Sequence, residues 1–385
     1  MYNKLSVYIA ACTGMAFFGI AFIVMGTVLP ALTAKYALDA VSASSLVTFL
    51  PIGVLLGSLV FGPVVDRFGY RILLISSIFI TLSGLEGLSF FDELNLLRCC
   101  IFFIGFGGGM LNGSTNSLVS EIYDNPDRSA KLSMLGACYG IGALLMPVML
   151  GMLSRYYSYE IILRATGLFM LLSILYFILI KFPEPLNPQG IPFKQMFLHF
   201  KQSTILILSL FLFFQSGIEG LFNNWTTTYL SGTTAIKASN IVLILTSFVL
   251  GMTAARLLLS KLLGRIKQFV VLTGGVVITL SGLAGLYYST NVIPATTSLF
   301  LCGFGLSAGF PLMLGIIGSL HKKAMGTAIG MALFIALTGN SVFNFAMGHI
   351  SRYFGIYTFP LFIASLLLFQ LIIIFSTKKL IDSNS

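Results

Sequence analysis

Charged residues are scarce in this chain of 385 amino acids. Only 9% are aspartate, glutamate, lysine or arginine, whereas about 25% is usual for a soluble protein. Hydrophobic residues make up 57% of the sequence, and they recur in apolar runs of about 20 residues, long enough to cross a bilayer. These features exclude a soluble globular domain and predict an all-α, multi-pass membrane protein.

Residues that bind metals or catalyse reactions are also few. The three histidines, His199, His321 and His349, are scattered, and the five cysteines lie in apolar segments without metal-ligand spacing. The sequence has no paired His-Glu motif and no phosphate-cradling loop. We therefore expect neither an enzyme nor a bound metal or cofactor.

The net charge of +10 follows the alternation of the predicted helices. Most basic residues fall on the side of the membrane that carries the N-terminus, while the other side receives Lys35, Arg155, Lys237 and Arg352. Because cytoplasmic loops are enriched in lysine and arginine, this pattern predicts that both termini lie in the cytoplasm. Membrane topology thus explains the charge, and no nucleic-acid partner is expected.

Apolar segments predict twelve transmembrane helices, six on each side of one long polar interruption. This interruption, 183–203, contains four prolines and several basic residues, and it predicts a cytoplasmic linker. The linker separates an N-terminal six-helix bundle (1–182) from a C-terminal six-helix bundle (204–385). The expected helices cover residues 6–34, 42–65, 71–91, 95–121, 129–154, 160–182, 204–230, 239–260, 267–288, 292–319, 324–350 and 354–376.

The two halves also resemble each other in sequence. Gly142 and the Gly-x-x-Ser-Arg-Tyr motif at 151–156 recur with the same spacing as Gly339 and the motif at 348–353. Repeated halves are typical of transporters that work by alternating access, with the substrate site near the bilayer midplane where the repeats meet.

Polar side chains inside the predicted helices are the candidate functional residues, since a charge at the bilayer centre costs about 2.5–3.5 kcal/mol on insertion scales. Gln215, Glu219 and Asn223 are four residues apart and share one helix face, close to Trp225. This stripe predicts a cavity lining in which Glu219 accepts hydrogen bonds from hydroxyl groups and Trp225 stacks on a sugar-like ring. Two alternatives stay open: Trp225 as an interfacial anchor, and Glu219 in an ion pair with Arg256.

Two pairs of asparagines have the same four-residue spacing. They are Asn112 with Asn116, and Asn340 with Asn344. Amide side chains both donate and accept hydrogen bonds, which is the chemistry that a polyhydroxylated ligand needs. Joining neighbouring helices, worth roughly 1 kcal/mol for each contact, is the alternative role.

The segment 62–71 is a dense cluster of charged and turn residues between two apolar runs. It predicts a short membrane-edge loop in which Asp66 lies against a helix N-terminus or an arginine. Its spacing, Gly62-x-x-x-Asp66-Arg67-x-Gly69-x-Arg71, resembles the loop between the second and third helices of the major facilitator superfamily, a class of secondary transporters. The resemblance implies that these five residues form a conformational-switch loop.

Four further segments are similar to the fucose permease-like group of that superfamily, which consists of sugar transporters, many of them proton symporters. The segments are 106–116, 139–147, 217–229 and 305–311. The resemblance adds Tyr139 to the substrate-binding candidates. Proton-coupled members carry acids in the first and fourth helices, where this sequence has Gly26 and Asn112. Glu219 is then the remaining proton-coupling candidate, with facilitated diffusion and sodium coupling as alternatives.

These observations predict a monomeric transporter in the cell inner membrane that takes up a sugar or sugar derivative by alternating access, coupled to protons. A drug or metabolite efflux antiporter is the alternative within the superfamily, although Met146-Pro147-Val148-Met149 replaces the paired glycines typical of such antiporters. A non-transporting membrane receptor is the alternative from another class, although the short linker leaves no room for a soluble signalling domain.

Overall fold

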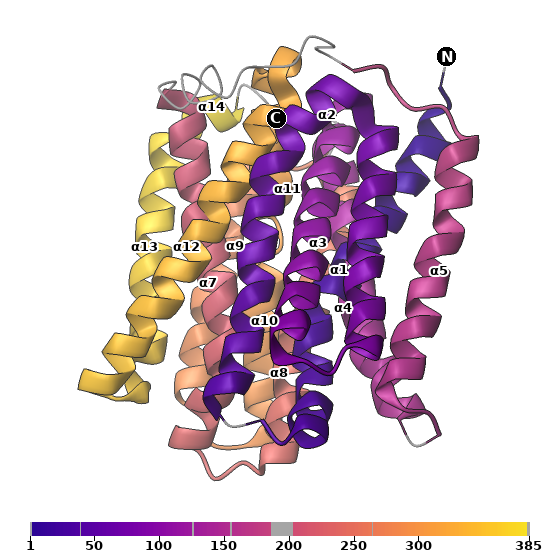
Figure 1. Cartoon of the computed structure of the whole chain (residues 1–385). Coiled ribbons are helices and arrows are strands. Elements are labelled where there is room, and N and C mark those ends of the chain that lie inside the picture. Colours follow the sequence, from indigo (N-terminus) through magenta and orange to yellow (C-terminus); the bar gives the residue numbers. More distant parts are fainter. Residues whose placement is uncertain are drawn as a thin grey trace. The chain divides into compact units, whose positions relative to one another are not determined.

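The computed structural model describes residues 2–38, 40–124, 127–154, 156–185, 203–263 and 265–382. Nearly all of these residues are helical, and no β-strand occurs among them (Figure 1). The all-α class expected from composition is therefore confirmed. Most of the predicted linker 183–203 lies outside the described residues, as do Arg155 and His199.

The described helices follow the expected order along the chain. Before the linker they are α1 (Lys4–Tyr36), α2 (Ala40–Phe90), α3 (Leu94–Ile122), α4 (Asp127–Leu153) and α5 (Tyr159–Leu179). After it they are α7 (Ser203–Thr233), α8 (Ala238–Leu262), α9 (Gln268–Tyr287), α10 (Val292–Leu306), α11 (Gly309–Leu320), α12 (Met325–Phe354) and α13 (Phe359–Ser376). Three short elements complete the described chain: η1 (Lys322–Ala324), η2 (Ile356–Thr358) and α14 (Lys378–Asp382).

Eleven helical segments of the described chain are long and apolar enough to cross a membrane. One of them, Thr48–Phe90 within α2, has 43 residues. At about 1.5 Å per residue it is roughly twice as long as the hydrocarbon core is thick. It therefore supplies two crossings, divided at Gly69, where the backbone is not helical. The twelve predicted crossings are all accounted for in this way.

The predicted loop at 62–71 is a correction. The helix continues through this segment and is interrupted only at Gly69, with φ 79° and ψ 172°. A positive φ with extended ψ is strained for any residue other than glycine, so a single glycine makes the break. The charged residues do not end the helix, because Asp66 is buried and hydrogen-bonded while Arg67 and Arg71 are exposed at the helix surface.

The expected helix 292–319 is also corrected, because it is broken into α10 and α11 at residues 307–308. Pro311 lies just inside α11 and has no N–H to donate to the carbonyl of Ser307, four residues earlier. The freed carbonyl of Ser307 accepts from Arg256 Nε at 3.4 Å. The carbonyl of Leu306 accepts from Gln215 Nε2 at 2.7 Å. Side chains of α7 and α8 thus donate hydrogen bonds to the carbonyl groups that the helix break leaves free.

The described residues group into two compact units. The first draws on Met1–Ile122, Cys138–His199 and His321–Phe334, and the second on Tyr123–Ala137, Phe200–Leu320 and Ile335–Ser385. Within the first unit α2 packs along α3 and α5, and α1 packs against α3. Within the second unit α10 packs against α8 and α9, and α7 packs against α11 and α13.

Glycines bring α2 and α3 into close contact in the first unit. Gly53 and Gly57 on α2, and Gly105 and Gly109 on α3, are each spaced four residues apart. A Cβ atom added at any of these four positions would collide with backbone atoms of the facing helix. The two backbones therefore pack against each other directly, as small residues allow in membrane proteins.

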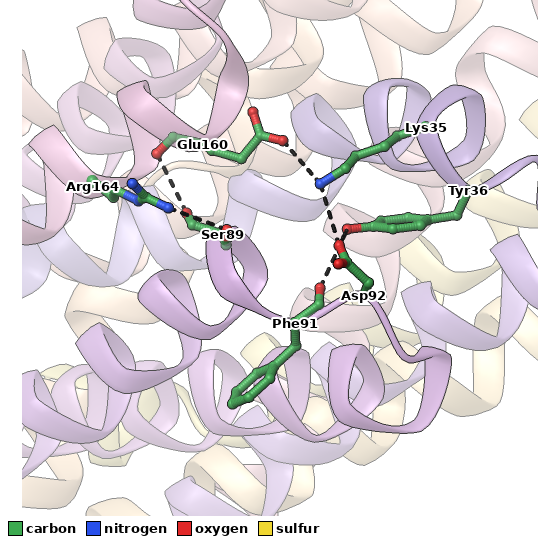
Figure 2. A network of polar contacts seen from close by, with 7 residues as sticks. All are labelled: Lys35, Tyr36, Ser89, Phe91, Asp92, Glu160 and Arg164. Atoms are coloured by element: carbon green, nitrogen blue, oxygen red, sulfur yellow. Dashed lines mark hydrogen bonds and ion pairs between the residues drawn. The ribbon is translucent and has the colours of Figure 1, made fainter.

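A polar network joins the end of α1, the turn between α2 and α3, and the start of α5 (Figure 2). Lys35 Nζ lies 3.2 Å from Glu160 Oε1 and 3.5 Å from Asp92 Oδ1. The hydroxyl of Tyr36 donates to Asp92 Oδ1 at 2.7 Å. The hydrogen bond from Tyr36, reinforced by the charge of Lys35, lowers the pKa of Asp92. Contact with Tyr36, followed by that with Glu160, raises the pKa of Lys35.

Replacing Lys35 with methionine is expected to lower the melting temperature by about 1–3 °C, since ion pairs this exposed are worth little. Because the pKa of Lys35 is raised in the folded protein, its contribution to stability is present below about pH 10 and is lost at higher pH. Because the pKa of Asp92 is lowered, its contribution is present above about pH 4 and is lost in acid. Melting curves of wild type and variant should therefore differ only within that window. Lys237→Met, at an exposed lysine of the second unit, is the control. A difference of constant size at every pH would contradict the assignment.

Candidate functional site

The candidate asparagines of α12 form a hydrogen-bonded cluster with α7 in the second unit. Asn344 Nδ2 donates to the Oδ1 of Asn340 at 2.9 Å, as their spacing predicts. Asn344 Oδ1 accepts from Trp225 Nε1 at 3.1 Å and from Asn224 Nδ2 at 3.0 Å. Asn340 Nδ2 donates to the carbonyl of Ser216 at 3.3 Å. The cluster therefore couples α7 to α12 and satisfies the indole N–H of Trp225.

The predicted stripe on α7 is a second hydrogen-bonded group. Gln215 Nε2 donates to Glu219 Oε1 at 2.7 Å, and Asn223 Nδ2 donates to the backbone carbonyl of Glu219 at 2.9 Å. Gln215 Oε1 accepts from Nε2 of Gln370 on α13 at 2.6 Å. Exposure rises along the stripe, since Gln215 is buried, Glu219 is half-buried and Asn223 is exposed. A ligand can therefore reach the Asn223 end more easily than the Gln215 end.

Arg256 on α8 places a buried positive charge in the same unit. Its guanidinium donates to the carbonyls of Ser307 at 3.4 Å and Gly136 at 3.1 Å. It also interacts electrostatically with Glu219, the partner suggested by the sequence. Arg256 thus donates a hydrogen bond to the break between α10 and α11 and also interacts electrostatically with the acid Glu219.

The first unit contains the remaining substrate-binding candidates. Asn116 Nδ2 donates to the carbonyl of Asn112 at 2.8 Å and to its Oδ1 at 3.0 Å, so the predicted pairing within α3 is confirmed. Tyr139 on α4 packs against Phe18 and Phe22 of α1, with ring centroids 5.3 and 6.4 Å away. This unit therefore offers an amide pair and an aromatic group, contributed by different helices.

The segment 62–71 meets the start of α12 within the first unit. Asp66 Oδ2 accepts from Thr327 Oγ1 at 2.6 Å and from the backbone N–H of Thr327 at 3.2 Å. The backbone of Gly62 lies so close that a Cβ there would be 2.9 Å from Thr327 Cα. The prediction that Asp66 lies against a helix N-terminus is confirmed, and the carboxylate complements the positive end of α12.

The arginines of this segment make separate contacts. Arg71 Nη2 donates to the carbonyl of Ile180, just beyond α5, at 2.6 Å. Arg67 is exposed, and its guanidinium lies 5.1 Å from the ring centroid of Phe68. Asp66 thus accepts hydrogen bonds from α12, while Arg71 donates one to the end of α5.

Replacing Asp66 with alanine is expected to lower the free energy of unfolding by about 2–3 kcal/mol, because Thr327 would keep two buried donors without their charged acceptor. Thr327→Val removes only the hydroxyl and is expected to cost about half as much. Denaturation of the purified variants in one detergent measures both effects. An Asp66→Ala protein as stable as wild type would show that the contact does not contribute to stability.

Sequence reasoning missed Gln370 and the contact partners of the segment 62–71. Gln370 is the single amide in the apolar sequence of α13, and its isolation there is the signal that could have marked it. Tyr70, next to Gly69, donates to Glu121 Oε2 at 2.7 Å within the first unit. No spacing rule links Tyr70 to Glu121, since they lie on different helices.

Comparisons with known proteins place these features in a wider group. Residues 10–344 match the family model described as Major Facilitator Superfamily. An uncharacterised MFS-type transporter, YfkL of Bacillus subtilis, is 24% identical over 352 residues, which cover 88% of this chain and 87% of the relative. A cis,cis-muconate transport protein of Acinetobacter baylyi is 25% identical over 349 residues, covering 84% of this chain and 82% of the relative.

Among solved structures, the fucose:proton symporter FucP of E. coli matches with a TM-score of 0.79. The match covers 96% of this chain and 98% of that chain, at 16% sequence identity. At this identity the likeness concerns the fold alone.

Proposed function

This chain belongs to the Major Facilitator Superfamily, and we propose that it is a secondary transporter that takes up a sugar or sugar derivative by alternating access. The observation that carries the substrate class is the amide cluster on α7 and α12. It offers donors and acceptors inside helices long enough to span a membrane, next to the single tryptophan of the sequence. Sugar hydroxyls require such paired hydrogen-bonding groups, and a ring face stacks on an indole.

The substrate contacts that we propose extend from exposed to buried groups. Asn223 and Asn224 are exposed, and Trp225 and Asn344 are half-buried, so a ligand reaches these residues first. The full set of proposed substrate-binding residues is Asn112, Asn116, Tyr139, Gln215, Glu219, Asn223, Trp225, Asn340 and Asn344. A protein of the same fold, the fucose:proton symporter of E. coli, has a sugar as its substrate.

Glu219 is the proposed proton carrier. It is a half-buried acid on α7, hydrogen-bonded to Gln215 and within the electrostatic influence of Arg256. An acid at such a position can bind a proton and release it during transport, which is a common role of carboxyl groups inside membranes. No metal or cofactor is part of this mechanism.

In this proposal the protein has the membrane topology that the sequence predicts. Both termini lie in the cytoplasm, the bundles 1–182 and 204–385 are joined by the linker 183–203, and the protein functions as a monomer in the cell inner membrane. The conformational switch in this proposal consists of Gly62, Asp66, Arg67, Gly69 and Arg71. The hydrogen bonds from Thr327 to Asp66 supply a contact that such a switch would make and break.

The test is uptake of radiolabelled sugars into proteoliposomes that contain the purified protein, with and without an inward proton gradient. We expect one sugar to accumulate only with the gradient, and Asn344→Leu to weaken its uptake at least tenfold through loss of the amide contacts. Liposomes without protein give the background. Absence of flux for every sugar in the panel would refute the substrate class.

An organic anion is the second candidate substrate. The muconate transport protein resembles this chain over most of both sequences, and Arg256 places a buried positive charge close to the α7 stripe. The same proteoliposomes, tested with cis,cis-muconate, separate the two substrate classes. Saturable muconate uptake without sugar uptake would favour this candidate.

A further inference from the structure

A buried chain of amide side chains leads from α13 through α7 to Glu219. Gln370 donates to Gln215 at 2.6 Å, and Gln215 donates to Glu219 at 2.7 Å. Gln370 is 1% exposed and Gln215 is 2% exposed, so bulk water does not compete for these bonds. The two glutamines and Leu306 also line a cavity with room for about one water molecule.

The direction of each hydrogen bond follows from the break between α10 and α11. The carbonyl of Leu306 can only accept, so the Gln215 atom that faces it at 2.7 Å is Nε2. The second hydrogen of this Nε2 is then directed to Glu219 Oε1. Gln215 Oε1 is left facing Gln370, which therefore presents its own Nε2.

This arrangement favours one protonation state of the acid. A carboxylate accepts the hydrogen bond from Gln215 readily, and donation to the charged form stabilises that form. Without Gln370, the buried Gln215 Oε1 loses its donor, and Gln215 must turn or shift to find another. We propose that Gln370 is a positioning residue, which holds Gln215 as a donor and thereby keeps Glu219 ready to release its proton. The inference rests on the proposed proton carriage by Glu219 and extends it to α13.

The other charged groups near Glu219 act separately from this chain. Arg256 on α8 interacts with Glu219 electrostatically. The described sequences of α11 and α13, which pack against α7, contain no titratable side chain, and η2 contributes only Tyr357. On α12, His349 packs against Phe345, farther along the helix than the asparagine pair. Loss of Gln370 should therefore alter the effect of the Gln215 hydrogen bond on the protonation of Glu219. The effect of the Arg256 charge should stay in place.

The experiment compares wild type with Gln370→Met, a variant of similar length that offers no donor. Infrared titration of the purified, full-length protein follows the carboxyl C=O band that Glu219→Gln removes, so it reports protonation of Glu219 without any transport. We expect the midpoint of this titration to rise by about one pH unit in Gln370→Met. The pH profile of gradient-driven uptake should shift in the same direction. Leu366→Met, at a buried apolar position of α13, should shift neither.

Each outcome bears on one of the two ideas. An unchanged or lowered infrared midpoint in Gln370→Met would overturn the role of Gln370. So would a shift of the uptake profile that persists when Glu219→Gln is also present. If the infrared midpoint rises but Glu219→Gln still accumulates substrate, Gln370 tunes the acid and proton carriage by Glu219 fails. Should Gln370→Met not fold, Gln370→Asn keeps an amide on a side chain one carbon shorter, which cannot reach Gln215 Oε1, and it must raise the midpoint.

Discussion

A valine at Gly109 is expected to abolish folding of the first unit. Gly109 lies on α3 where the helix meets the backbone of Val54 on α2, and a Cβ atom there would overlap the carbonyl group of Val54. The obstacle is backbone, so no rotamer change relieves it, and the two helices must separate. Their separation would also open the contacts at Gly53, Gly57 and Gly105. The cost should reach several kcal/mol, comparable with the whole stability of many proteins.

Gly151→Val is the matched control for this prediction. Gly151 also lies in a membrane-spanning helix, α4, but a Cβ atom added there meets no other atom within 4 Å. Size-exclusion chromatography and thermal melting of both variants measure the difference. We expect Gly151→Val to elute and melt like wild type, while Gly109→Val yields little monodisperse protein. Equal behaviour of the two variants would show that α2 and α3 tolerate separation.

The fold was predictable because hydropathy and helix length are local properties of the sequence. Apolar runs of membrane-spanning length located the helices, and a membrane offers few alternatives to a helix for such runs. The break between α10 and α11 was not predicted, because the segment is apolar throughout and its length suits one membrane crossing, although Pro311 in its interior cannot donate the N–H of an unbroken helix. The sequence does not predict the continuation of α2 to Gly69, because charged residues such as those at 66–71 are typical of the ends of membrane helices.

The candidate site was predictable only within single helices. Asn344 bonds to Asn340, as a four-residue spacing implies. Its bond to Trp225 joins α12 to α7, and no spacing rule shows which helices are neighbours. Gln370 was missed for the same reason: its significance comes from Gln215, which lies on another helix. Sequence patterns therefore identify shared faces, while partners across helices require the fold.

Replacing Glu219 with glutamine is expected to abolish proton-driven accumulation while substrate exchange continues. Glutamine has the size of glutamate and keeps a carbonyl oxygen that can accept the hydrogen bond from Gln215, so the local packing should persist. It cannot take up a proton. A gradient of one pH unit is worth about 1.4 kcal/mol, and with one proton carried per substrate it supports at most about tenfold accumulation. In the variant the internal concentration should only equal the external one.

Exchange separates the loss of coupling from the loss of binding. Proteoliposomes preloaded with unlabelled substrate exchange it for labelled substrate without net proton movement, so Glu219→Gln should exchange at a rate close to that of wild type. Glu86→Gln, which neutralises an acid in α2 of the first unit, is the control and should still accumulate substrate. If the Glu219→Gln protein also accumulates substrate, another group must carry the coupling proton. Equilibration without accumulation in wild type itself would make the protein a facilitator, as the absence of acids at Gly26 and Asn112 allows.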